Sequence, residues 1–144
     1  MSRRTDALDH LLAGGLLRGA LVTGGRSAGA RVACRTAPAY PVRGVVCLAF
    51  PLHLPGRQAS RLPELLTPAV PRLVLQGTRD TFGPAAELEA ALAGVAPPGA
   101  PRVTVVPLAG ADHSFRTTKE TGLTPAELRE RLVAAVLAFV LSLG

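Results

Sequence analysis

Apolar positions along the 144-residue chain fall into two alternating patterns. Short runs of consecutive apolar residues are typical of strands that are buried on both faces of a parallel sheet. Longer stretches with apolar residues three and four positions apart are typical of helices that cover such a sheet. The predicted strands are residues 20–23, 44–50, 72–76 and 102–108. The alternation predicts an α/β fold with a mostly parallel sheet of about four strands and flanking helices.

Local signals place helices before and between these strands. The first is predicted over residues 5–13, and the second runs from Ser27 to Ala37, just before a proline. A third is predicted to start at Pro84, whose fixed φ suits the first helical turn. The last begins with a capping box at 124–127. The apolar stripe of this last helix consists of Leu128, Leu132, Ala135, Val136 and Phe139.

Composition and length favour one domain over residues 1–144, because 48% of the residues are hydrophobic and the mean hydropathy is +0.31. The segments 51–63 and 96–101 are predicted to be loops that join α/β elements rather than domain boundaries. Cys34 and Cys47 lie in apolar stretches and are predicted to be buried.

The net charge of +6 raises the question of a nucleic-acid partner. The basic residues, however, are spread singly along the chain, and aromatic residues make up only 3% of it. Nucleic-acid binders usually gather their basic residues and interleave aromatic ones for base stacking. We therefore expect no nucleic-acid partner.

The chain ends show no targeting or membrane signal. Residues 1–15 lack the apolar run of a signal peptide, and the apolar stretch 132–143 is shorter than the roughly 20 residues that cross a bilayer. We expect a cytoplasmic protein without a membrane partner. The histidines, His10, His53 and His113, have no metal-ligand spacing, so neither a metal nor another cofactor is predicted.

A G-x-S-x-G pentapeptide spans residues 25–29, where the first predicted strand meets the second predicted helix. This is the sequence form of a nucleophile elbow, a sharp turn that exposes the serine hydroxyl at the edge of the sheet. Ser27 is the candidate nucleophile, and the N–H of Ala28 is a candidate oxyanion-hole donor. Because glycine is abundant in this chain, the pentapeptide alone is only suggestive.

Two further residues follow strands in the order that completes a Ser-Asp-His triad. Asp80 comes after the third predicted strand and His113 after the fourth. The carboxyl ends of parallel strands meet at one edge of a sheet, so these residues are expected to lie close to Ser27. His113 would take the serine proton during attack on a carbonyl, while Asp80 would orient the imidazole.

Each candidate also has a simpler structural interpretation. Ser27 is a good helix N-cap, Asp80 suits the cap of a tight turn, and His113 could be a loop histidine bonded to backbone. Asp112 is an alternative acid, although adjacent side chains in an extended loop seldom face each other. The coincidence of three such residues at three strand ends favours the triad.

Four parts of the chain, residues 24–33, residues 47–56, residues 76–80 with 82–83, and Gly110 with 112–115, carry a resemblance to a known group. This group is the small α/β-hydrolase-fold proteins related to dienelactone hydrolases, and we refer to the four parts as the resembling segments. This group includes bacterial members, a testis-expressed mammalian protein and a subunit of a chromatin-acetylating complex. The resemblance covers the chain from about residue 16 onward, and it implies Ser27, Asp80 and His113 as the triad. Arg26 and His53 would line the pocket.

The resemblance also reveals a difference, because family members carry further strands before the elbow, including a loop that donates the second oxyanion-hole N–H. We therefore expect this chain to be the C-terminal part of an α/β-hydrolase fold. Its first strand would be an unpaired apolar edge, through which a homodimer is expected. The leading hypothesis is a serine hydrolase acting on an ester, thioester or related acyl bond of a small molecule. The alternative is a non-catalytic interaction module or an inactive truncated hydrolase.

Overall fold

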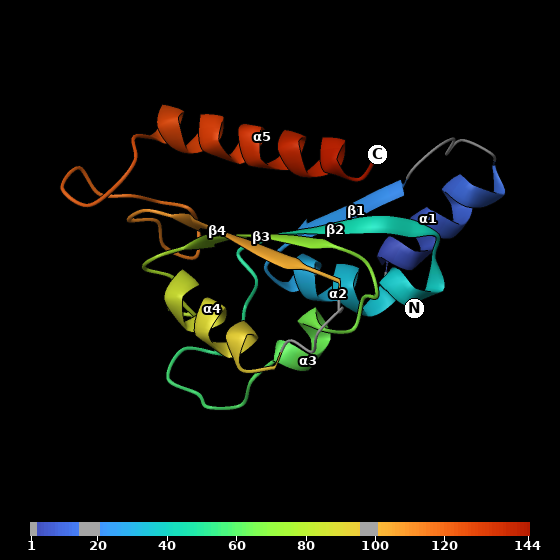
Figure 1. The fold of residues 1–144 in the computed structure, drawn as a ribbon, viewed down its shortest axis with the longest axis horizontal. Coiled ribbons are helices and arrows are strands. Elements are labelled where there is room, and N and C mark those ends of the chain that lie inside the picture. Colours follow the sequence, from blue (N-terminus) through green and yellow to red (C-terminus); the bar gives the residue numbers. More distant parts are fainter. Residues whose placement is uncertain (1–2, 15–20, 96–100) are drawn as a thin grey trace.

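The computed structural model describes residues 3–14, 21–95 and 101–144. The sheet consists of β1 (Leu21–Arg26), β2 (Val42–Leu48), β3 (Arg72–Gly77) and β4 (Val103–Leu108). Its strands lie in the order β1-β2-β3-β4, and all three neighbouring pairs are parallel (Figure 1). The predicted α/β fold with a four-stranded parallel sheet is confirmed. Most of the predicted loop at 96–101 lies outside the described residues.

The first two strands are shifted from their predicted bounds. β1 continues to Arg26, because Gly24 and Gly25 pair in register with Val46 and Cys47 of β2. β2 ends at Leu48 rather than at residue 50, since the next residue, Ala49, has a φ of 53° and leaves the extended conformation. The elbow pentapeptide therefore begins inside the strand and not after it.

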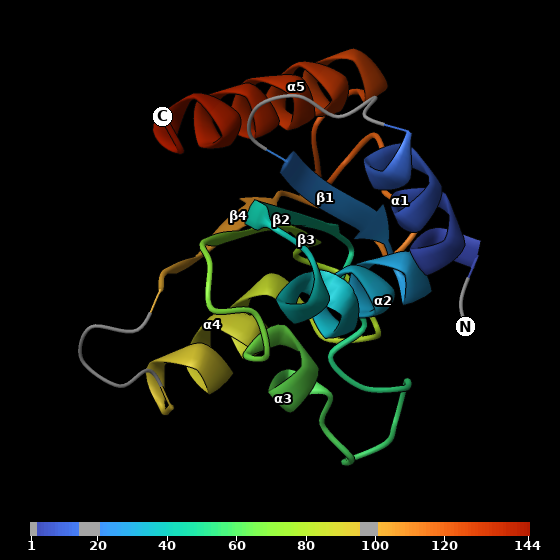
Figure 2. The same cartoon turned by 90° about the vertical axis from the view of Figure 1, so that its right-hand side faces the viewer.

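Helices cover both faces of the sheet (Figures 1 and 2). One face carries α2 (Ala28–Thr36), the short α3 (Leu62–Leu65) and α4 (Ala85–Ala93), and the other carries α5 (Pro125–Ser142). A 3-10 turn, η1 (Ala37–Ala39), follows α2, and α1 (Arg3–Ala13) precedes the sheet. The hydroxyl of Tyr40 donates a hydrogen bond of 2.8 Å to Asp9 of α1.

Some helix bounds differ from the sequence prediction. Pro84 is the N-cap of α4 rather than its first residue, because its ψ of 158° is extended. The second helix stops at Thr36, one residue early, and continues as the 3-10 turn. The short helix α3 begins in the last two residues of the predicted loop 51–63 and continues to Leu65, so the loop ends at residue 61. Four residues of helix are too few for a periodic pattern to reveal.

The core between the sheet and α2, α3 and α4 is closed to solvent. Both cysteines have an exposed fraction of 0%, which confirms the prediction that they are buried, and their sulfur atoms lie 3.6 Å apart. The fully buried members of this core are Ala30, Ala33, Cys34, Val45, Cys47, Phe50, Leu65, Val74 and Leu88. This packing fixes the start of α2 against β1 and β2.

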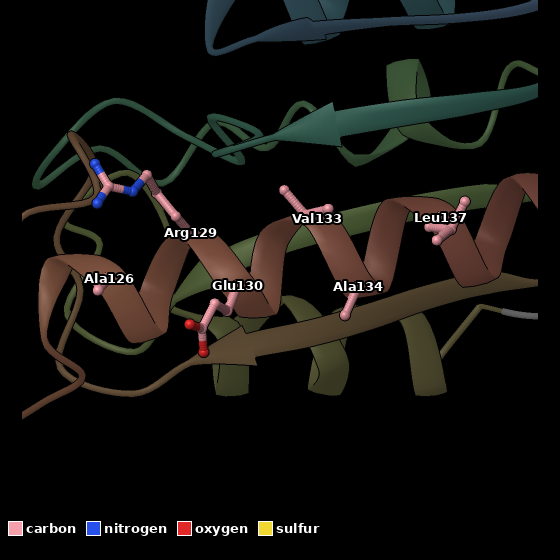
Figure 3. Close-up of a pocket in the computed structure, with 6 residues that line it drawn as sticks. All are labelled: Ala126, Arg129, Glu130, Val133, Ala134 and Leu137. Atoms are coloured by element: carbon pink, nitrogen blue, oxygen red, sulfur yellow. The ribbon is translucent and has the colours of Figure 1, made fainter.

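The core on the other face forms under α5. The predicted stripe is confirmed, since Leu128 and Phe139 are buried here and the remaining three residues pack against them. The capping box at Thr124 and Glu127 is also present. The outer side of α5 is less covered: Val133 and Leu137 are 66% and 57% exposed, and with Ala126, Arg129, Glu130 and Ala134 they line a shallow hollow (Figure 3).

Within the described ranges β1 pairs with β2 alone, so β1 is an edge strand there. The homodimer expected through this edge stays a prediction. None of the helices in the described part of the chain is long and apolar enough to span a membrane.

Candidate active site

Ser27 occupies the turn between β1 and α2, at the carboxyl end of its strand. Its backbone has φ 52° and ψ −117°, a conformation that costs a non-glycine residue about 1–3 kcal/mol. The amide of Ser27 donates a 2.8 Å hydrogen bond to the carbonyl of Leu48 in β2, which helps to hold the turn. The serine side chain makes no capping hydrogen bond to α2. Ser27 therefore stands at the N-cap position of α2, as the simpler interpretation has it, but its side chain does not cap the helix.

The two glycines of the pentapeptide have different steric roles. A Cβ on Gly25 would lie 2.3 Å from the backbone carbon of Gly29, so only glycine lets β1 and α2 approach this closely. A Cβ on Gly29 would meet nothing within 4 Å. The first glycine of the motif is thus required by packing, whereas the second is not.

His113 bridges Ser27 and Asp80 from the loop between β4 and α5. Its Nε2 lies 2.8 Å from the hydroxyl oxygen of Ser27, and its Nδ1 lies 2.9 and 3.0 Å from the two carboxylate oxygens of Asp80. A carboxylate can only accept, so Nδ1 carries the proton and Nε2 is free to accept from the serine hydroxyl. Residues 27, 80 and 113, which are far apart in sequence, are brought together as the strand-end argument predicts.

Asp80 is only 1% exposed and has partners besides His113. The amide of Phe82 donates a 2.8 Å hydrogen bond to its Oδ1, and the side-chain amide of Gln76 lies 3.4 Å from its Oδ2. Asp80 therefore caps the turn after β3, as the simpler interpretation has it, and contacts the imidazole as well. The hydrogen bond from the Phe82 amide helps to fix the orientation of the Asp80 carboxylate toward His113.

Gln76 is a residue of this site that sequence reasoning missed. Its side chain is fully buried, and its Nε2 donates to the carbonyls of Phe50 at 2.9 Å and Gly83 at 2.7 Å. These bonds join the loop after β2 to the loop that carries Asp80. The only sequence signal is a polar residue directly after the apolar run 73–75 of a predicted strand.

Asp112, the alternative acid, is occupied elsewhere. Its Oδ1 accepts hydrogen bonds from the amides of Ser114 at 2.8 Å and Arg116 at 2.9 Å. The Arg116 amide is the main cause of a lowered pKa for Asp112; burial opposes this shift, and the Ser114 amide adds to it. Asp112 shapes the loop around His113, while Asp80 contacts the imidazole.

The remaining predicted site residues lie around this core. Ala28 is the first residue of α2, a position whose N–H has no acceptor within its own helix. The guanidinium of Arg26 lies 5.9 Å from the ring centroid of Phe115. His53 turns to α4, where its Nε2 is 2.7 Å from a carboxylate oxygen of Glu87. The pocket-lining role of Arg26 and His53 stays a prediction.

Among the residues that the structure describes, no group of three or more His, Cys, Asp or Glu side chains could hold a metal ion. The site contains a hydroxyl, an imidazole and a buried carboxylate that are linked in series by hydrogen bonds. In such a series the imidazole can remove the proton of the hydroxyl as the hydroxyl oxygen attacks an electrophile.

The comparisons with known proteins agree with this fold. A family model described as an alpha/beta hydrolase domain matches residues 4–141. Among solved structures, an alpha-beta serine hydrolase homologue from Coxiella burnetii is similar, with a TM-score of 0.54 and 22% identity over 76% of this chain and 48% of its own. A pyrethroid hydrolase from Sphingobium faniae JZ-2 has a TM-score of 0.58 and 18% identity over 94% of this chain and 75% of its own.

At these identities the two structures show the likeness of fold alone. The chain spans about half the length of the Coxiella burnetii protein. No curated protein matches the sequence.

Proposed function

Because the chain belongs to the α/β-hydrolase domain family, we propose that it is a serine hydrolase that cleaves an ester, thioester or related acyl bond of a small molecule. The observation that carries the proposal is the unbroken series of contacts from the hydroxyl of Ser27 through His113 to Asp80. Within the family we assign it to the dienelactone-hydrolase-like group, on the residues of the four resembling segments.

In the proposed reaction, the oxygen of Ser27 attacks the carbonyl carbon while Nε2 of His113 takes the hydroxyl proton. The tetrahedral intermediate collapses, and the same imidazole returns the proton to the leaving group. Water then attacks the acyl-serine in the same manner and releases the acid. Asp80 stabilises the imidazolium formed in each half-reaction, and its burial strengthens that interaction.

The negative oxygen of the intermediate needs donors that are fixed before the reaction begins. We propose the N–H of Ala28 as one of them, since it stands at the amino end of α2, where the helix dipole is positive. The family resemblance implies a second donor from a loop before the elbow strand. Loss of one such donor typically costs about 10²–10³ in rate, so activity depends strongly on that loop.

The proposed substrate class is a small acyl compound, and the name of the Sphingobium faniae enzyme, a pyrethroid hydrolase, is compatible with an ester. The proposed pocket includes Arg26 and His53. The proposed location is the cytoplasm, and no cofactor takes part in the proposed reaction.

Labelling with a fluorophosphonate tests the proposal, because this reagent reacts much faster with an activated serine than with an ordinary hydroxyl group. We expect the intact chain to become labelled and Ser27→Ala to remain unlabelled. Ser114→Ala is a matched control, since Ser114 is exposed and lies next to His113 in sequence. A well-folded chain that takes up no label, or one that is still labelled after Ser27→Ala, would contradict the proposal and favour a non-catalytic interaction module.

A further inference from the structure

Phe82 contacts both groups that would activate the serine. Its ring lies over the imidazole of His113, with the two centroids 4.0 Å apart and the ring planes inclined by 26°. Its amide donates a 2.8 Å hydrogen bond to Oδ1 of Asp80. We propose that Phe82 is a positioning residue, whose ring keeps the imidazole of His113 in the plane in which it reaches Ser27 and Asp80 together. This inference rests on the proposed hydrolase function.

The contact matters because the hydrogen bonds of His113 alone leave its ring free to rock. Nδ1 lies within 0.1 Å of equal distance from the two oxygens of Asp80, at 2.9 and 3.0 Å, so rotation between them costs little in hydrogen bonding. A stacked aromatic face resists tilting of the imidazole out of its plane toward Phe82. It also covers one face of the imidazole, whose side chain is 18% exposed.

Phe82 is itself held on several sides. Its carbonyl accepts a 3.1 Å hydrogen bond from the amide of His53, in the loop after β2. The next residue, Gly83, is tied by its carbonyl to Gln76 at 2.7 Å and by its amide to the carbonyl of Asp80 at 3.2 Å. The ring is thus presented from a backbone that is fixed independently of His113, as a positioning role requires.

Substitution of the ring separates positioning from simple packing. Phe82→Leu keeps the backbone amide and an apolar side chain but removes the aromatic face, whereas Phe82→Tyr keeps the face. Because the aromatic contact is lost, we expect fluorophosphonate labelling of Phe82→Leu to be about 2- to 10-fold slower. The concentration of reagent that gives half the maximal rate should not change, and Phe82→Tyr should restore the rate.

A second measurement requires no reaction. The proton on Nδ1 of His113, hydrogen-bonded to a buried carboxylate, gives a far-downfield proton NMR signal while the ring is held still. We expect this signal in the unmodified chain and in Phe82→Tyr, and its broadening by exchange with water in Phe82→Leu. Phe115→Leu is the matched control, because this phenylalanine lies in the same loop as His113 but packs toward the α5 core.

The proposal fails if Phe82→Leu keeps both the signal and the labelling rate, or if Phe115→Leu loses the signal to the same degree. Phe82→Met, which keeps apolar bulk without a ring, replaces Phe82→Leu if that variant does not fold. If no variant takes up label but the signal depends on the ring as expected, the positioning inference stands and the serine hydrolase proposal falls. The two proposals are therefore tested separately.

Discussion

The candidate active site has two halves that are built differently. The acid–base half consists of Asp80 and His113 with the residues that contact them, and every polar group of these two side chains has a partner. The nucleophile half consists of Ser27 and the start of α2, held by one backbone hydrogen bond to Leu48 and by the close approach of two glycines. The first half is held mainly by polar contacts, together with the ring of Phe82 against the imidazole, and the second mainly by steric fit.

This difference follows from where each half lies in the sheet. Asp80 follows β3, which has a strand on either side, so its loop can be tied to both neighbours. Ser27 follows β1, which is one of the two edge strands in the described part of the chain. His113 follows the other edge strand, β4, but its imidazole is tied to the carboxylate of Asp80. The base that would activate the serine is therefore assembled within these residues. The second oxyanion donor, by the family resemblance, would come from beyond β1.

The largest effect is expected from breaking the acid–base half. Asp80→Asn keeps the shape of the side chain, but its amide can turn an N–H toward Nδ1 and so favour the wrong tautomer of His113. The equivalent change in a serine protease lowers the rate about 10⁴-fold, and we expect a loss of about 10³–10⁴ in the rate of fluorophosphonate labelling. Asp112→Asn is the matched control and should label at nearly the normal rate. Equal losses in both variants would mean that the acid has been wrongly assigned.

Breaking the nucleophile half requires a steric change instead. In Gly25→Ala the new methyl group would lie 2.3 Å from the backbone of Gly29. The backbone cannot move aside as the flexible end of a side chain could. We expect the free energy of unfolding to fall by about 3 kcal/mol or more, at or above the upper end of ordinary overpacking. Chemical denaturation followed by circular dichroism measures it.

Gly29→Ala is the matched control for this change, because its methyl group would enter open space on a helix. Alanine is a better helix former than glycine, so the variant should be as stable as the unmodified chain or up to about 1 kcal/mol more stable. If both variants lose the same stability, the motif needs two glycines for a reason other than the observed contact.

The features that the sequence predicts correctly are those set by the topology of the sheet. The apolar runs are enough to predict a parallel sheet. Because parallel strands end at one edge, the positions of Ser, Asp and His after successive strands are enough to predict that residues 27, 80 and 113 meet. Sequence could also state that Asp80 rather than Asp112 faces His113, from the geometry of adjacent side chains. These inferences depend on topology, which periodic patterns encode.

What the sequence could not predict depends on individual contacts. Nothing in the pattern showed that Gln76 would join two loops through its amide, or that the ring of Phe82 would lie over His113. The predicted end of β2 lies two residues beyond the observed one, because an alanine with positive φ leaves no compositional trace. The first predicted strand stops before Gly24 and Gly25, because paired glycines more often indicate a turn.

A smaller loss of stability is expected when the hydrogen bonds that hold the loop of Asp80 are removed at Gln76, which takes no part in the proposed reaction. Gln76→Met keeps the bulk of the side chain but leaves the buried carbonyls of Phe50 and Gly83 without their donor. Unpaired buried groups cost about 1–3 kcal/mol, so we expect the free energy of unfolding to fall by that amount. Gln58→Met, at an exposed glutamine, should change it little. An unchanged stability in Gln76→Met would show that these bonds do not hold the loop.

The smallest effect concerns the helix that carries the nucleophile half. Arg31 of α2 donates to Glu64 of α3 at 2.7 Å, and the two side chains are 25% and 21% exposed. Burial raises the pKa of Glu64, but the hydrogen bond and charge of Arg31, with the charge of Arg35, outweigh it, so the pKa lies below its ordinary value of 4.5. We expect Glu64→Gln to lower the free energy of unfolding by about 0.5–1 kcal/mol at pH 7.

The sign of the pH dependence follows from that lowered pKa. The contribution of Glu64 is fully present above the pKa of the unfolded chain and disappears as the pH falls through the folded value, because the protonated carboxyl no longer attracts the guanidinium groups. The difference in unfolding free energy between the unmodified chain and Glu64→Gln should therefore shrink below about pH 4.5 and vanish in stronger acid. Glu89→Gln, at an exposed position on α4, should show no such difference. A difference that persists in acid would mean that α2 is held by packing alone, which would extend the steric character of the nucleophile half to its whole helix.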